Sequence, residues 1–151
     1  MTRGVYKISQ KITVTTAKTL LQIKAGVGGL EILRASVTNA SVEVSDTAHI
    51  QLLRKTVAAT VTSLTPKLTS PNDQAAKAVG GTAATGHTAT AEGTDGDIMD
   101  EEGNNVLSGY RYLPIPEERF EVDVGGFIAL KSVITIAGTD LVAVMVFREL
   151  N

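Results

Sequence analysis

The chain has 151 residues, of which 43% are hydrophobic and 20% are charged, and its formal net charge is -2 at pH 7. This length and composition predict a single soluble domain. The lack of cysteine excludes disulfides, a thiol nucleophile and a thiolate zinc site. No apolar run approaches the roughly 20 residues of a membrane helix, and the opening MTRGVYKISQ lacks the apolar stretch of a secretion signal. The 14 basic and 16 acidic side chains give no broad positive field, so we expect neither a membrane nor a nucleic-acid partner.

Residue type favours β-structure. The chain contains 16 Val, 10 Ile and 19 Thr residues, so that 45 of the 151 residues are β-branched, and it has no Trp. Branching at Cβ restricts the χ1 rotamers and suits the pleated surface of a sheet better than a helix. We therefore expect an all-β fold in one domain that spans residues 1–151.

The first third of the chain carries a series of predicted strands, at residues 5–16, 19–25, 30–39, 41–44 and 48–55. In the first of these, apolar residues such as Tyr6 and Ile8 alternate with lysines and polar residues, which is typical of a half-buried strand. The second and third flank Gly26-Val27-Gly28-Gly29, whose glycines can adopt the positive φ values of a tight turn. These two strands are therefore expected to form a hairpin.

A long excursion is expected over residues 57–104, where Ala, Thr, Gly and Asp replace large apolar residues. Within it, Ser70 as N-cap, Pro71 at the first position, and Gly80-Gly81 as a stop predict one short helix. The stretch at 81–97 fits either an edge strand or an extended surface loop. Because this excursion and an N-terminal arm at residues 1–10 are the segments least committed to a core, we expect them to reach towards a partner.

Strand patterns return at the carboxyl end, at residues 106–113, 120–124, 127–136 and 141–147. The last two are predicted to form a hairpin through residues 137–140, where Gly138 can take a left-handed conformation. The final strand is apolar on both faces, with Leu141 and Phe147 on one face and Val144 on the other. Such a strand belongs at the centre of a sandwich or under a subunit interface. Eight or nine strands of this kind predict a jelly-roll-like β-sandwich.

Groups that carry enzyme chemistry are few. The two histidines, His49 and His87, do not form the H-x-H spacing of a barrel metal site, and a lone histidine is usually a surface or locally bonded residue. The carboxylates from Asp95 to Glu102 include the oxygen ligands that calcium accepts, but their order departs from the calcium-loop pattern. We interpret residues 95–102 as a solvated, mutually repelling loop and leave cation binding there open. No catalytic residue, cofactor or metal is expected.

The most distinctive segment is 109–120, which reads GYRYLPIPEERF. One interpretation is a strand that ends in a proline-stiffened corner, with Arg119 paired to a nearby carboxylate. The other is a surface that faces a partner, because Tyr and Arg are enriched at interface cores. On the second interpretation, Tyr110, Tyr112 and Arg119 are the predicted contact residues.

This segment, extended to YRYLPIPEERFEV, has the pattern aromatic-x-x-x-P-x-P-E-E-R ahead of the final hairpin. Together with TLLQI, LEILRASV and the closing LVAVMVFREL, it resembles the small jelly-roll proteins that decorate, or cement, the capsids of tailed bacteriophages. The resemblance covers most of the chain outside residues 57–104. It implies a β-sandwich that binds the outer surface of a mature shell as a symmetric oligomer and seals contacts between major capsid subunits.

We therefore expect a structural virion protein without enzymatic activity. It would be made in the host cytoplasm, lie on the capsid exterior, and associate with the major capsid protein and with itself as a trimer or a dimer. The main alternative is a receptor- or carbohydrate-binding jelly-roll module of a phage fibre or spike. A chain with six aromatic residues and no Trp has few rings to stack on sugars, which counts against it. A barrel hydrolase or epimerase ranks below both, because no base, nucleophile and orienting group converge in the sequence.

Overall fold

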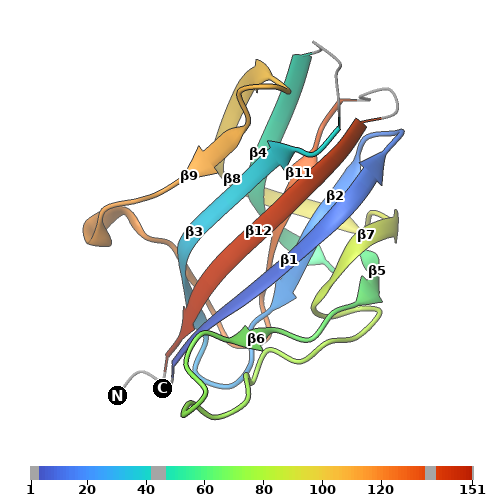
Figure 1. The fold of residues 1–151 in the computed structure, drawn as a ribbon. Helices are drawn as coiled ribbons and strands as arrows, with labels where there is room; N and C mark the ends of the chain where they lie inside the picture. Colours follow the sequence, from blue (N-terminus) through green and yellow to red (C-terminus); the bar gives the residue numbers. More distant parts are fainter. Residues whose placement is uncertain (1–3, 42–46, 135–138, 151) are drawn as a thin grey trace.

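The computed structural model describes residues 4–41, 47–134 and 139–150, which fold into two packed antiparallel sheets (Figure 1). Sheet A consists of β1 (Gly4–Val14), β3 (Leu30–Asn39), β6 (Lys67–Leu68), β9 (Tyr110–Tyr112), β10 (Glu121–Val122) and β12 (Thr139–Glu149). Sheet B consists of β2 (Lys18–Lys24), β4 (Thr47–Val57), β5 (Thr60–Ser63), β7 (Gly86–Ala91), β8 (Thr94–Asn105) and β11 (Phe127–Ser132). No helix in the described part of the chain is long and apolar enough to cross a membrane.

The strand order is that of a jelly roll. Sheet A runs β6-β1-β12-β3, with β9 and β10 paired one after the other along the free side of β3. Sheet B runs β5-β7-β2-β11-β4-β8. Without β5, β6 and β7, the chain fills four positions in each sheet, which is the double Greek-key arrangement of eight strands. The expected all-β sandwich is therefore confirmed, and β5 to β7 form an insertion between β4 and β8.

The core lies between the two sheets, and period-2 alternation places its residues there. In β12, the odd-numbered residues from Thr139 to Glu149 are buried, whereas the even-numbered residues are partly exposed on the outer face. Tyr6 and Phe147 pack ring against ring at 5.7 Å between centroids. The position expected for the last strand is confirmed, because β12 is the central strand of sheet A, between β1 and β3.

Two expected reaching segments are instead part of the sheets. Residues 4–10 are not an arm, because they form the start of β1, which pairs with β12 from Gly4 to Val14 and buries Tyr6 and Ile8. Residues 1–3, 42–46, 135–138 and 151 lie outside the described residues, and most of the strand expected at 41–44 falls among them. The two expected hairpins are wrong, because β2 and β11 lie in sheet B whereas β3 and β12 lie in sheet A, so each connection crosses from one sheet to the other. About half of the excursion at 57–104 is likewise strand, since β5, β6, β7 and most of β8 fall within it.

The helix expected at 70–81 is wrong. Ser70 and Asp73 close a turn through a backbone hydrogen bond, and the chain then continues without helical structure. The backbone groups that a helix would pair internally are bonded elsewhere: the carbonyl of Gln74 accepts from the Tyr6 hydroxyl at 2.7 Å, and the amide of Lys77 donates to the buried Glu149 carboxylate at 2.8 Å. Among the described residues, the single helical element is a 3₁₀ turn, η1 (Pro116–Glu118).

Candidate functional site

The segment between β9 and β10 forms a corner at the edge of sheet A. Both strands pair with β3, through Tyr112 opposite Ala35 and Val122 opposite Leu30, so the two ends of the corner are fixed to the sheet. The residues between them leave the ladder and project away from the sandwich, as the orange segment beyond β9 shows (Figure 1). This shape fits the proline content, because Pro114 and Pro116 have no N–H to donate to a strand ladder.

Tyr110 and Tyr112 anchor this corner in the core and do not reach the surface as the predicted contact residues would. The Tyr110 hydroxyl donates to Asp100 at 2.6 Å, and the Tyr112 hydroxyl donates to the carbonyl of Glu118 at 3.0 Å. Tyr112 also stacks on Phe120 with 4.8 Å between ring centroids. Burial is the main cause that raises the pKa of both phenols, and it brings the pKa of Tyr112 to about 12. In the single chain both tyrosines are therefore packing residues of the corner, and their contact with a partner stays a prediction.

Arg119 lies beside a carboxylate, as the first of the two interpretations of this segment predicts. Its guanidinium lies 3.9 Å from the Glu31 carboxylate on β3, which also accepts a hydrogen bond from Arg148 on β12. Two guanidinium groups thus converge on one partly buried carboxylate. This arrangement ties the far end of the corner to two strands of sheet A, and it leaves little of Arg119 free for a partner.

The residues that the corner does expose are apolar. Leu113 is 65% exposed and Ile115 is 58% exposed, on either side of Pro114. The turn behind them is closed by a backbone hydrogen bond from Glu118 to the carbonyl of Ile115 at 2.9 Å. We name residues 113–116 the apolar corner. The sequence analysis did not single out Leu113 or Ile115. Pro114 and Pro116 were the available sign, because a residue beside a proline is a poor candidate for a paired strand.

The acidic run at 95–102 is part of strand β8 and not a loop. Its carboxylates are drawn to different partners: Asp100 accepts from Tyr110, Glu101 contacts His49 at 2.7 Å, and Asp95 bonds two lysines. Hydrogen bonds from His49 and Gln51 hold the pKa of Glu101 below its usual value. No group of three or more metal-ligating side chains occurs among the described residues. His87 contacts Thr88 at 2.9 Å, and burial lowers its pKa.

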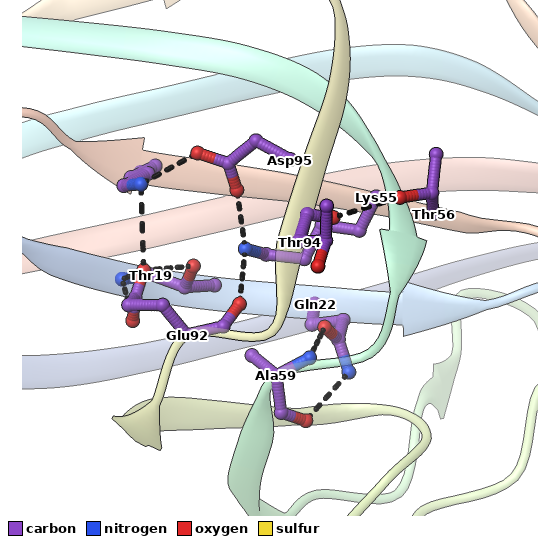
Figure 2. Close-up of polar contacts among 9 residues, drawn as sticks. Thr19, Gln22, Lys55, Thr56, Ala59, Glu92, Thr94 and Asp95 are labelled. Carbon is purple, nitrogen blue, oxygen red and sulfur yellow. Dashed lines mark hydrogen bonds and ion pairs between the residues drawn. The ribbon is translucent and has the colours of Figure 1, made fainter.

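A cluster of polar side chains ties the turn between β7 and β8 to strands β2, β4 and β11 on the outer face of sheet B (Figure 2). The ammonium of Lys55, whose side chain is fully buried, donates to Asp95 and to the carbonyl of Glu92, each at 2.7 Å. The Glu92 carboxylate accepts from the backbone amide and hydroxyl of Thr19, and Lys131 bonds Asp95 at 2.6 Å. Burial alone would raise the pKa of Asp95, but the two lysines outweigh it and hold the pKa below its usual value. The cluster is internally satisfied, which is the property of a structural network.

A cleft of about 250 Å³ opens between the start of β8 and the turn that joins β10 to β11. Its charged lining consists of Asp97, Asp123, Arg54 and Lys55, and Phe127 contributes an aromatic ring. Arg54 is held in place by a hydrogen bond to the carbonyl of Glu121 at 2.7 Å. The cleft therefore combines two carboxylates, two cationic side chains and one aromatic ring, which are groups that can bind a polar ligand.

Comparisons with protein-family models, with curated proteins and with solved structures find no match to this chain. The function of the chain is therefore inferred from its own contacts and its sequence pattern.

Proposed function

We propose that the chain is a structural virion protein that binds the outer surface of an assembled phage capsid and stabilises the contacts between major capsid subunits. It acts without catalysis, as a homo-oligomer on the capsid exterior after synthesis in the host cytoplasm. The support comes from the resemblance of the 110–122 segment to capsid decoration proteins and from the jelly-roll frame that presents this segment. Each copy can bind weakly, because linked contacts to a repeated lattice raise the effective concentration of the next contact.

The observation that carries the proposal is the apolar corner. Leu113 and Ile115 stand outside the sandwich on a turn fixed by two prolines and by the buried rings behind it. A rigid apolar projection loses little conformational entropy on binding, so most of its burial energy contributes to affinity. Burying the two side chains in a groove of the shell is worth about 3 kcal/mol, which is about 100-fold in affinity.

The test is rebinding to shells from which the protein has been removed. The wild-type chain should bind at one copy per capsid subunit, or per small symmetric group of subunits, and raise the temperature at which the particles release DNA. Leu113→Ser combined with Ile115→Ser should weaken binding about 100-fold. Leu107→Ser is the matched control, because Leu107 is 60% exposed in the turn before β9 and lies outside the apolar corner.

Three outcomes would count against the capsid proposal. Particles that release DNA at the same temperature with and without the protein would remove its stabilising role. A handful of copies per particle would move the protein to a fibre or vertex. Equal binding by the corner variant and the Leu107→Ser control would show that the apolar corner is not the contact.

The cleft favours a second candidate, a receptor- or carbohydrate-binding module. Asp97 and Asp123 offer acceptors for sugar hydroxyls, and Phe127 offers a ring, although the Lys24 ammonium already lies 5.8 Å from that ring's centroid. A glycan array probed with the wild-type chain and with Asp97→Asn/Asp123→Asn tests this candidate. Signals lost in the variant would support it, and an array without signals would leave the capsid proposal as the better account.

A further inference from the structure

The outer face of sheet A carries a stripe of valines at its centre. In β12, Val142, Val144 and Val146 point away from the core, because the residues between them are buried. All three remain partly exposed. A β-strand on the open side of an antiparallel sheet usually carries polar residues there, so three consecutive outward valines mark a surface suited to contact with another protein.

Basic side chains flank the valine stripe. Val142 lies opposite Lys11 and Val146 opposite Lys7 on β1, and Val146 lies opposite Arg34 on β3. The next strands outward continue the pattern, with Lys67 on β6 opposite Lys7, and Arg111 on β9 opposite Ser36. We name this set the basic valine face. Lys11 is paired with Asp140 at 3.4 Å, but in the described residues Lys7, Arg34, Lys67 and Arg111 have no carboxylate partner.

The corresponding face of sheet B is not open in this way. Leu53 on β4 and Ala129 on β11 point outward beside Lys55, yet both are fully buried. The polar cluster around Glu92 and Asp95 holds the chain over them (Figure 2). Among the described residues, the chain around Glu92 thus lies over part of the outer face of sheet B, whereas the outward valines of sheet A stay partly exposed.

The edge strand β8 offers the complementary surface. Asp97, Glu101 and Glu102 are exposed along it, and Ile98 is 48% exposed between them. β8 pairs with β4 on one side and ends sheet B on the other. One part of the molecule therefore presents apolar residues flanked by cations, and another presents carboxylates along a strand edge.

We propose that the basic valine face of one copy binds the acidic β8 edge of a second copy. The two surfaces differ, so the contact is head-to-tail, and an open assembly keeps one free face at one end and one free edge at the other until a ring closes. The inference rests on the self-association included in the proposed function, but it does not depend on capsid binding. Because its charges are exposed, the contact should weaken roughly tenfold when the salt concentration rises from about 0.05 M to 0.5 M.

The test uses two charge-reversed variants of the full chain in sedimentation velocity at low salt. Lys7→Glu/Arg34→Glu breaks the basic valine face, and Asp97→Lys/Glu102→Lys breaks the acidic edge. Each variant alone should sediment as a monomer of 15.8 kDa. Mixed in equal amounts, they should associate again, because the intact face of one variant pairs with the intact edge of the other and the two reversed surfaces are also complementary in charge.

Lys18→Glu/Lys24→Glu on β2 is the matched control, since it changes the net charge by the same amount as the face variant and leaves sheet A intact. It should associate like the wild type. Each variant is first shown to melt cooperatively; a reversal that does not fold is replaced by the neutral Lys7→Gln/Arg34→Gln or Asp97→Asn/Glu102→Gln, for which weaker association is expected.

A wild-type chain that stays monomeric at every concentration would overturn this inference while leaving binding to the shell untouched. An edge variant that associates like the wild type, beside a face variant that does not, would show a face-to-face contact and overturn the head-to-tail arrangement. A mixture of the two variants that remains monomeric would also overturn the head-to-tail arrangement. Loss of shell binding by the corner variant with normal self-association would, in contrast, bear only on the proposed function.

Discussion

Replacing Lys55 by methionine tests whether the polar cluster of Figure 2 holds the insertion over sheet B. Methionine keeps the length and the apolar stem of lysine, so the substitution removes the charge and its hydrogen bonds with little change in packing. Two bonds are lost, one to Asp95 and one to the carbonyl of Glu92, each 2.7 Å long. Without the Lys55 ammonium, the carbonyl of Glu92 loses the hydrogen bond that it accepts from it.

The expected decrease in the free energy of unfolding follows from the loss of these two hydrogen bonds. A hydrogen bond to a charged group contributes about 1.5–3 kcal/mol net. Asp95 keeps its bond to Lys131 and is 36% exposed, so solvent compensates part of its loss. We therefore expect Lys55→Met to lower the free energy of unfolding by about 2–3 kcal/mol, which corresponds to a fall in Tm of about 5–10 °C for a chain of this size.

Urea denaturation followed by circular dichroism measures this difference at neutral pH. Lys11→Met is the control, because Lys11 is 62% exposed and its 3.4 Å pair with Asp140 should contribute less than about 1 kcal/mol. Adding Asp95→Asn to the wild type and to Lys55→Met completes a double-mutant cycle. In it we expect a coupling energy of about 1–2 kcal/mol between Lys55 and Asp95. If Lys55→Met proves as stable as the wild type, the buried charge contributes nothing net, and packing of the lysine stem explains the closure.

Individual contacts give three further predictions. Tyr110→Phe keeps the buried ring but removes the 2.6 Å bond to Asp100, so the free energy of unfolding should fall by about 1–2 kcal/mol in a urea titration. Gly29→Ala should cost more than Gly125→Ala in the same assay, because both glycines have positive φ but only at Gly29 would a Cβ meet a backbone oxygen, at 2.6 Å. The pKa of Asp95 is lowered in the folded state, so its stabilisation is present above the unfolded pKa near 3.8 and is lost as the pH falls through the folded pKa; the stability difference between the wild type and Asp95→Asn should therefore shrink in acid.

Strands rich in apolar residues were predictable from the sequence. The range expected for β3, 30–39, is the observed one, and β12 was placed correctly at the centre of a sandwich, because large apolar residues recur at close spacing in both. Such a pattern predicts burial, because each inward side chain packs into the core regardless of which strand pairs beside it. The class and the layered architecture follow from these strands.

The segment from β5 to β8 was not predictable in the same way. β8 is rich in Asp, Glu and Gly, which are poor strand formers, and its structure depends on pairing with β4, a contact that local sequence does not encode. The helix signals at 70–81 failed for a related reason, because distant groups such as Tyr6 and Glu149 take the backbone hydrogen bonds of that segment. In both cases tertiary contacts override local propensity.

The candidate contact residues show that residue type alone does not distinguish an interface residue from a buried anchor. Tyr110, Tyr112 and Arg119 were chosen as residue types that interfaces prefer, but the same types also suit a buried anchor with one polar end. The structure uses the tyrosines to fix the corner from inside and leaves Leu113 and Ile115 outside. Alternation within β9, where Arg111 is exposed between two buried tyrosines, was the available sign.

The two proposed contacts make different contributions to binding on a shell, and this makes them separable. Binding by a single copy depends on the apolar corner, so Leu113→Ser/Ile115→Ser should reduce it at every protein concentration. Self-association through the basic valine face links copies that are each already bound, and its effect is to multiply the individual affinities. Lys7→Glu/Arg34→Glu should therefore leave the affinity of sparse copies unchanged while flattening the rise in occupancy at higher concentration. If the face variant instead weakens binding equally at all concentrations, the basic valine face itself contacts the shell.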